Sequence, residues 1–599
     1  MGQWINGQGG PRYIPFPFWI LRFFDSPIPS LLFLISCSIP VLFLGLSAPA
    51  FMDHEGRYAE VAREMLLTGD WITPQLNFTP FLNKPPLAFW ITALIFRAIR
   101  ISESARAWVA VSGVGTLLVT FLLGHILAGP HTAFYSSLIL LLSGGFFLET
   151  RLLRPDMLLT LCVTVAFYGF LKAEHSKAEP ERTRWLCLSA ISLAFSVMTK
   201  GFVGVIIVAA TIGIVLLWCG RLVSLRDVRW TYPLAVALCV IVPWHFLVGL
   251  RHPGFFWDYA INQHLLFFFD QKFPRDSIPD SVTVFWGAFL GRTVPWSIFL
   301  PVAMWHTVRE ARHSPSLAML LPLTWLSVVL LLFSLSPSRL EHYSIPALPA
   351  VALLVGRWWA NIPATASAGT HSGGVGCVLL ALAGICGFFL TSPLLATEHW
   401  TQQFPLLQQY ALSVCRIIIV SSLLAAMAFW GRRPQLAFAV LACMMPWQFL
   451  HIYHSLVLIE PLNSWKPIGE CIARLPSDGE ILFAASEEYQ ICGGLNFYSQ
   501  RPLTIILPDG FTPPTYLDVQ NSRAFISTEE AVHRWRESRP VLLLVDPARK
   551  EDRSLTTRLS PTATIGQWGD RLLLANRNFA ERTPATYDCS TQLLFNRQR

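Results

Sequence analysis

Long apolar runs, separated by short polar segments, occupy most of this chain. A transmembrane helix needs about 20 mostly apolar residues. About thirteen runs approach that length, near residues 30–50, 107–127, 132–149, 156–173, 185–200, 201–219, 231–250, 281–303, 317–335, 344–360, 373–391, 411–430 and 435–455. The apolar run at 87–98 is only about a dozen residues long, so we expect a helix lying along the membrane surface. The pattern predicts an α-helical polytopic membrane protein.

The composition supports the same class. The chain is 53% hydrophobic and 14% charged, whereas soluble domains carry about 25% charged residues. Its 22 Trp and 42 Phe suit helix ends anchored at the membrane interface. These values exclude a disordered chain, a collagen-like chain, a disulfide scaffold and a soluble enzyme with one large core. The net charge of +8 lies in short loops, which favours topology-determining charge over nucleic-acid binding.

The basic loops give an orientation. If 87–98 does not cross the membrane, loops 172–184, 221–229 and 309–312 share one side, which the positive-inside rule makes cytoplasmic. Arg97, Arg100 and Arg106 then fall on the outer side, against the rule. The first run is long for a signal-peptide core and shows no convincing cleavage site, so we interpret it as a retained span.

This orientation divides the chain into three parts. We expect a cytoplasmic tail at 1–28, a transmembrane part at 29–456 and an outer domain at 457–599. The outer part contains the strand-like segments EILFAAS, PLTIIL, PVLLLVD and RLLLAN and the helix-like segment STEEAVHRWRE, which predict a small α/β domain. It shows no glycine-rich phosphate loop, so packing or acceptor docking is its expected role. One disulfide is allowed among Cys471, Cys492 and Cys589.

Ionisable residues near membrane depth are costly and are therefore functional candidates. In FMDHEGRYAEVAREMLLTGDWITP, Asp53 and Glu55 flank His54, and a helix with Arg57 and Tyr58 follows. Two carboxylates beside an arginine suit a general base and an orienting group. They equally suit a helix N-cap with a salt bridge, and both interpretations stay open.

Two further segments add charge on the outer side. In FLNKPPLAFW, Pro85 and Pro86 hold Lys84 at a rigid corner where its ammonium suits a lipid phosphate, with a snorkelling anchor as the alternative. In ETRLLRPDMLLT, Arg154 and Asp156 stand at a span boundary, with a helix N-cap as the alternative for Asp156.

Two later segments complete the set. Asn262 and His264 lie in an aromatic-rich stretch, where a lone histidine is more often hydrogen-bonded at the interface than bound to a metal. Arg339, His342 and Tyr343 begin a span. Cations that hold a departing phosphate and a carboxylate that accepts a proton are what transfer from a lipid phosphate requires.

Six segments, in order, resemble a known family. They are HEGRYAEVAREMLLTGDWITPQLN, FLNKPPLAFWITAL, RPDMLLT, MTKGFVG, INQHLL and SLSPSRLEHYSIPALP. Together they resemble the bacterial membrane glycosyltransferases related to the protein O-mannosyltransferases and the lipid A aminoarabinose transferase, over roughly residues 30–350. The resemblance implies a GT-C-type fold of about thirteen transmembrane helices, with interfacial helices in the first outer loop. It also implies an outer-facing active site, a polyprenyl-phosphate-linked sugar donor and an inverting displacement.

The resemblance also implies roles for individual residues. The family's adjacent Asp-Glu pair is replaced here by Asp53-His54-Glu55, so the base is Asp53 or Glu55, with Asp53 favoured. Asp156 matches the second family acid and is expected to orient the acceptor or Lys84. The residues expected to hold the donor phosphate are Arg57, Tyr58, Lys84, Arg339, His342 and Tyr343, and those in support are His54, Arg154, Asn262 and His264.

Two departures from the family bear on cofactors. Asn83 and Gln263 stand where relatives carry acids, which weakens the case for a divalent metal, and no metal ligand is assigned. The expected function is transfer of a sugar to a hydroxyl or phosphate of lipid A, another lipid, a glycan or a protein, on the outer face of a bacterial inner membrane. No nucleic-acid partner is expected. A lipid-linked-sugar flippase, which would need polar residues across the bilayer midplane, and an inactive scaffold are the alternatives.

Overall fold

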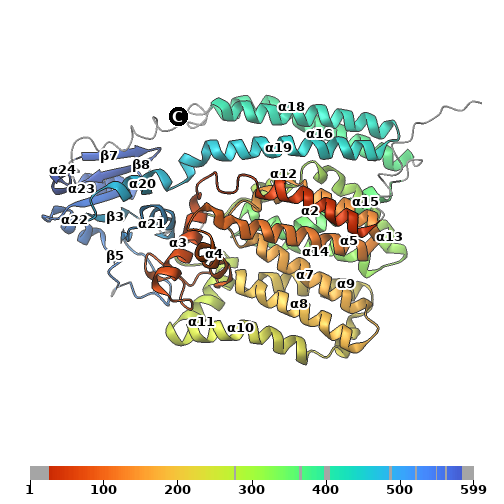
Figure 1. The fold of residues 1–599 in the computed structure, drawn as a ribbon, viewed down its shortest axis with the longest axis horizontal. Helices are drawn as coiled ribbons and strands as arrows, with labels where there is room; N and C mark the ends of the chain where they lie inside the picture. The colour runs from red at the N-terminus through yellow and green to blue at the C-terminus, as the bar shows by residue number, and fades with distance from the viewer. Residues whose placement is uncertain are drawn as a thin grey trace, which may run out of the picture.

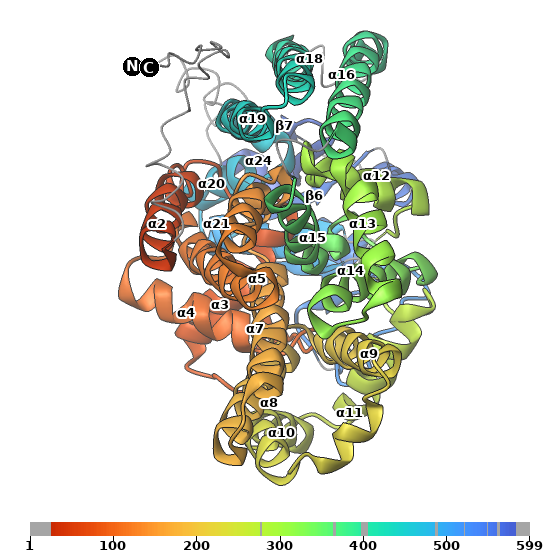
Figure 2. The ribbon, with the colours of Figure 1, turned by 90° about the vertical axis from the view of Figure 1, so that its right-hand side faces the viewer.

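The computed structural model describes residues 26–275, 278–362, 367–396, 405–484, 489–519, 522–547, 549–559 and 563–582. Long helices run side by side along the long axis of the molecule, and a sheet domain packs at one end of them (Figure 1). Seen from the opposite end, the helices form one bundle, with α16, α18 and α19 along one side and α8 and α10 on the other (Figure 2).

The predicted apolar runs fall on helical segments. The bundle helices are α2 (Pro27–Phe43), α5 (Ala107–Leu141), α6 (Gly144–Glu149), α7 (Asp156–His175), α8 (Glu179–Lys200), α9 (Val203–Trp218), α10 (Thr231–Arg251), α12 (Val282–Arg292), α13 (Leu300–His313), α14 (Leu317–Leu335), α15 (Leu348–Ala360), α16 (Ser367–Ala396), α18 (Pro405–Trp430) and α19 (Pro434–Asn463). Within the described residues, seven helical stretches are long and apolar enough to cross a membrane. The chain is therefore a multi-pass helical membrane protein.

Fewer helices pass this length test than the thirteen predicted runs because several are short or interrupted. The helices α2 and α9 have 17 and 16 residues. The segment from α12 to α13 is broken by the 3-10 turn Trp296–Phe299, which follows Pro295. The helix α15 is preceded by the 3-10 segment Glu341–Ala347.

The helix α5 turns back on itself. Gly129 has a φ of 86°, next to Pro130, and interrupts the helical backbone. The Ser137 hydroxyl reaches the Leu117 carbonyl at 3.5 Å, and a Cβ added at Gly124 would lie 2.8 Å from the Cα of Ala133. These contacts make the two halves of α5 antiparallel, as the separate runs at 107–127 and 132–149 predict.

The segment between α2 and α5 lies where the bundle meets the sheet domain (Figure 1). It contains α3 (Asp53–Thr68), the hairpin β1 (Gln75–Leu76) and β2 (Thr79–Pro80), α4 (Leu87–Ala98) and the 3-10 turn Glu103–Arg106. The apolar residues of α3 recur at helical spacing, and the helix ends at Gly69, whose φ of 70° suits a glycine. The expected short helix at 87–98 is α4.

The sheet domain has a mixed, six-stranded sheet in the order β5-β4-β3-β6-β8-β7. The strands β3 (Glu480–Ala484), β4 (Thr504–Ile506), β5 (Phe525–Ile526) and β6 (Val541–Val545) are parallel, and β8 (Arg571–Ala575) and β7 (Ala563–Trp568) complete the sheet antiparallel to them. The four predicted strands are β3, β4, β6 and β8, and the predicted helix is α22 (Thr528–Arg536).

Helices cover both faces of this sheet. One core contains Ile481 and Leu542 with residues of α20 (Lys466–Arg474), α21 (Gly493–Ser499) and α24 (Arg577–Arg582). The other contains Leu482 and Leu543 with residues of α22 and α23 (Lys550–Leu559). Burial on both faces explains why β6 reads as a continuous apolar run. Cys471 is disulfide-bonded and Cys492 is a buried free thiol, while Cys589 lies outside the described residues.

Candidate active site

Glu55, in the first turn of α3, is buried, and both of its carboxylate oxygens accept hydrogen bonds. The two oxygens accept hydrogen bonds from Nε and Nη2 of Arg106 at 2.8 and 2.7 Å. The backbone N–H groups of Leu153 and Met52 donate to the same carboxylate at 2.6 and 3.1 Å. These contacts match the salt-bridge and helix-start interpretation of the sequence. Asp53 begins α3, and its side chain lies outside the described residues.

A small polar cavity of about 60 Å³ lies beside the start of α3. Four basic side chains surround it, contributed by α3, the segment before α4, the turn before α7 and the end of α8. They are Arg57, Lys84, Arg154 and Lys200, and the carboxylate in the same lining is Asp156. His54, Tyr58, His342 and Tyr343 complete the predicted residues found here.

Asp156 and Lys200, both in this lining, form an ion pair. The Lys200 ammonium lies 2.6 Å from an Asp156 oxygen and 4.5 Å from the centre of the Tyr343 ring. Pro155 is the N-cap residue of α7, so Asp156 is its first residue and does not act as a cap. The sequence assigned no role to Lys200, although an ionisable residue at the end of an apolar span was a usable signal.

Arg57 connects this cavity to the sheet domain. Its guanidinium donates to Oε1 of Gln490 at 3.0 Å and lies 3.3 Å from Nδ1 of His54. Arg154 stands on the same cavity, and its guanidinium makes no hydrogen bond or ion pair with the residues that the structure describes. The cavity therefore offers an anion several donors at once.

An apolar cavity of about 140 Å³ continues from the polar one. The two share Lys84, Asp156, Lys200 and Tyr343 together with Phe267. The wider lining is mainly aliphatic and aromatic, from Val203, Ile206, Phe268, Leu332 and Phe333. Charged groups at one end and apolar walls at the other suit an amphipathic ligand whose head is an anion.

His264 lines the apolar cavity in a hydrogen-bonded role. Its Nε2 accepts the Phe202 N–H at 3.3 Å, and its Nδ1 contacts the Tyr259 carbonyl. Burial lowers the pKa of His264, so the ring is neutral at neutral pH. Within the described part of the chain, no three His, Cys, Asp or Glu side chains lie close enough together to hold a metal ion.

Two predicted site residues, Arg339 and Asn262, form hydrogen bonds that fix neighbouring loops. Arg339 donates to the carbonyls of Phe333, Ser334 and Asp280, each at 3.2 Å, and is not in the lining of either cavity. Asn262 donates to Asp258 at 2.8 Å and accepts the Phe273 N–H at 3.1 Å. Both side chains shape segments next to the cavities.

Sequence comparison finds similarity to a known family over part of the chain. Residues 33–259 match the family model of the dolichyl-phosphate-mannose-protein mannosyltransferases. The chain is 32% identical over 325 residues to an uncharacterised protein of Aquifex aeolicus, covering 53% of this chain and 62% of that protein. It is 28% identical over 346 residues to the undecaprenyl phosphate-alpha-4-amino-4-deoxy-L-arabinose arabinosyl transferase of Pseudomonas savastanoi, covering 56% and 61%. The matches thus span about three fifths of the length of these relatives.

Structural comparison shows the same fold over nearly the whole chain. ArnT from Cupriavidus metallidurans, solved with bound undecaprenyl phosphate, superposes with a TM-score of 0.76 at 22% identity, covering 92% of this chain and 98% of ArnT. The oligosaccharyltransferase of Archaeoglobus fulgidus is more distant, with a TM-score of 0.50 at 11% identity. The family resemblance predicted from the six sequence segments is confirmed.

Proposed function

We propose, from the match of residues 33–259 to the family model of the protein mannosyltransferases, that the chain transfers a sugar from a polyprenyl-phosphate-linked donor to an acceptor. The observation that carries the proposal is the pair of joined cavities. Four cations and one carboxylate surround the polar end, and apolar side chains line the other. A polyprenyl phosphate has the matching division into an anionic head and an apolar tail.

The donor phosphate lies among Arg57, Lys84, Arg154 and Lys200 in this proposal. The Lys200 and Asp156 side chains are largely buried, and burial strengthens charge interactions relative to water. The cations therefore stabilise the phosphate most when it departs from the anomeric carbon and its negative charge grows. Asp156 holds the Lys200 ammonium in place through their 2.6 Å contact.

Asp53 acts as the base. An acceptor hydroxyl attacks the anomeric carbon, its proton passes to the Asp53 carboxylate, and the polyprenyl phosphate leaves from the opposite face. Asp53 is the first residue of α3, one turn from Arg57. Glu55 is the positioning residue, because both of its oxygens already accept hydrogen bonds.

The membrane topology follows from the helices and the basic loops. We propose about thirteen crossings, with the shorter and interrupted helices crossing as well, and α4 along the surface. The cavities and the sheet domain then face the periplasm of a bacterial inner membrane. The acceptor is a lipid, a glycan or a protein, with lipid A among the lipids.

The test is turnover by purified protein in lipid, with radiolabelled polyprenyl-phosphate sugars of several types. We expect Asp53→Asn to lower turnover at least 10²-fold, the usual contribution of a general base, while donor binding persists. Arg154→Gln is expected to weaken donor binding about tenfold, since one charge-assisted hydrogen bond is lost. Lys177→Gln, on an exposed loop, is the matched control.

Undiminished turnover in Asp53→Asn would exclude Asp53 as the base. Tight donor binding without turnover of any sugar would favour a flippase or an inactive scaffold. Movement of a labelled donor across vesicles that contain the protein would then separate these two.

A further inference from the structure

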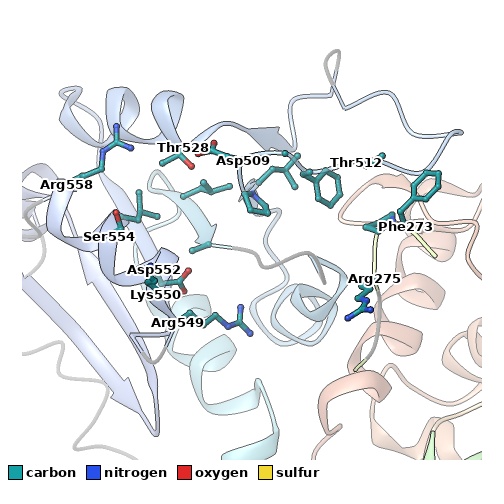
Figure 3. A pocket seen from close by; sticks show the side chains of 18 of the residues that line it. Phe273, Arg275, Asp509, Thr512, Thr528, Arg549, Lys550, Asp552, Ser554 and Arg558 are labelled. Carbon is teal, nitrogen blue, oxygen red and sulfur yellow. The ribbon is translucent and has the colours of Figure 1, made fainter. Parts of the chain in front are cut away.

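The loop between β4 and β5 leaves the sheet and packs on the helical part of the molecule. Its described residues are 507–519 and 522–524. The Thr515 hydroxyl donates a hydrogen bond to the Gly254 carbonyl at 2.9 Å, and a Cβ added at Gly254 would lie 2.6 Å from the Thr515 carbonyl oxygen. Thr512 of this loop and Phe273 of the helical part line the same pocket, and Figure 3 shows them on one side of it. The loop is therefore one of the places where the sheet domain meets the helical part.

Tyr516 in this loop is buried against the corner that precedes α4. It shares one apolar core with Leu82 and Phe255 of the helical part. Its hydroxyl accepts the Leu82 N–H at 3.2 Å and donates to Oδ1 of Asn83 at 2.9 Å. A buried tyrosine hydroxyl usually bonds to a partner, and here the partners are two consecutive residues. The next residue in the chain is Lys84.

Asn83 is held from its other side by the segment 258–266. This segment is a π-helix, a rare form that is frequent at functional sites. Nε2 of Gln263 donates to Oδ1 of Asn83 at 3.3 Å and to Oδ2 of Asp258 at 3.2 Å. All three side chains are buried. A buried chain of hydrogen bonds therefore runs from the sheet domain through Asn83 to the π-helix.

Lys84 extends from this corner into the proposed donor site. It lines both cavities, and Asn83 lines the apolar one. A lysine side chain is a flexible stem with a point charge at its end, so the place of the ammonium depends on where the backbone starts. The hydrogen bonds of Tyr516 fix the two residues before Lys84, and Pro85 restricts the backbone after it. The position of the Lys84 ammonium is therefore set from both directions along the chain.

We propose that Tyr516 is a positioning residue for Lys84, through which the sheet domain sets the affinity of the site for the donor phosphate. This inference rests on the proposed function, in which Lys84 is one of the four cations around that phosphate. A small displacement of a positioned group is enough to lose most of its effect. A contact that only docked the sheet domain would change stability and leave donor affinity as it is.

The first test is binding of undecaprenyl phosphate to the full-length protein in nanodiscs. Tyr516→Phe keeps the buried ring and removes the hydroxyl, so Leu82 and Asn83 lose a partner while the apolar packing stays. We expect the Kd to rise about tenfold. Thr515→Val is the matched control, because it removes the neighbouring hydrogen bond to Gly254 and leaves the bonds of Tyr516 in place. Its Kd should equal that of wild type.

A double-mutant cycle separates positioning from docking. Lys84→Gln removes the charge that Tyr516 is proposed to position. In this background Tyr516→Phe should have no further effect on the Kd, because the effects of coupled residues do not add. The same tenfold factor in both backgrounds, an unchanged Kd in Tyr516→Phe alone, or an equal rise in Thr515→Val would overturn the proposal.

Hydrogen exchange gives a readout that needs no ligand. The Leu82 amide loses its acceptor in Tyr516→Phe, so its exchange should rise while the bundle helices stay protected. Unchanged exchange at Leu82 would show that the hydroxyl does not hold this corner. Turnover tests the transferase proposal separately. If wild type transfers no sugar but the exchange and the binding cycle behave as expected, the transferase proposal fails and the positioning role of Tyr516 stands.

Discussion

At the scale of single residues, Arg106 shows how an apparently misplaced charge is accommodated. All three guanidinium nitrogens donate hydrogen bonds: Nε and Nη2 to Glu55. Nη2 also donates to the Ala50 carbonyl, and Nη1 donates to the carbonyls of Leu46 and Pro49. The side chain is 1% exposed. A buried pair of this kind contributes little net stability when intact, but removing one partner leaves a charge without compensation.

We therefore expect Arg106→Gln to lower the free energy of unfolding by about 3–5 kcal/mol. Asp53→Asn should leave it unchanged, because Asp53 is proposed to act in the chemistry. Thermal unfolding in lipid nanodiscs measures both, with Arg97→Gln, an exposed arginine of the same segment between α2 and α5, as the control. A melting temperature of Arg106→Gln equal to that of wild type would contradict a structural role for the pair.

The candidate site shows which residues a sequence can predict. His54, Arg57, Lys84, Arg154 and Asp156 were predicted, because each is an ionisable residue next to an apolar run. Arg106 appeared only as an exception to the charge rule, because its partner lies 51 positions away in the chain. Lys200 received no role from the sequence, since nothing local indicates its contact with Asp156, 44 positions away in the chain.

At the scale of elements, the β1–β2 turn depends on a carboxylate in α3. Asn77 and Phe78 have φ of 56° and 58°, a conformation that is unfavourable for phenylalanine. Their N–H groups donate to the two oxygens of Glu64 at 2.7 and 2.8 Å. Burial, and then the neighbouring charge of Glu60, raise the pKa of Glu64 to about 9.

This shift predicts a pH dependence. The folded protein keeps the Glu64 proton up to about pH 9, whereas the unfolded chain releases it near the ordinary value of 4.5. The folded state binds more protons across this window, so its stability is highest at the acid end and falls as the pH rises. The melting temperature of Glu64→Gln should change less between pH 5 and 9 than that of wild type. Glu179→Gln, an exposed glutamate, should follow wild type, and parallel profiles for all three would contradict this role for Glu64.

Periodicity predicted the positions of most elements but not their interruptions. Apolar runs and strand-like segments identify regular structure because they report burial. The 3-10 segments before α13 and α15 depend on local backbone geometry at proline-containing turns. The strand β5 has two residues, too few to form a pattern.

At the scale of the whole molecule, the sheet domain packs directly on the segment that carries the site. A Cβ added at Gly56 of α3 would overlap the Cα of Gly494 in α21, and one added at Gly493 would lie 2.7 Å from the Cα of Arg57. The Tyr498 hydroxyl accepts the Phe51 N–H at 2.7 Å. The two backbones meet with no side chain between them, so this contact tolerates no added atom.

We expect Gly56→Ala to separate the sheet domain from α3 and to lower turnover strongly, because the Arg57–Gln490 contact is lost. Hydrogen exchange should rise in α21 while the bundle helices stay protected. Gly287→Ala, in α12, has nothing within 4 Å of the added Cβ and is the control. Unchanged exchange in α21 would show that the interface absorbs the methyl group.

The presence of a C-terminal α/β domain was predicted, but its place on α3 was not. The change in composition indicates where the long apolar runs stop and a separate domain begins. The close approach of Gly56 and Gly494 depends on residues 438 positions apart, with no local pattern that pairs them.

The same glycine contact limits how this protein can be recombined. A chimera that exchanges only the sheet domain with a relative would bring a foreign surface against α3 and leave the start of that helix without its matching partner. A working exchange has to carry residues 51–106 together with the sheet domain, although several hundred residues separate them in the chain. The two segments therefore have to change together, because a substitution in either limits the substitutions that the other can accept.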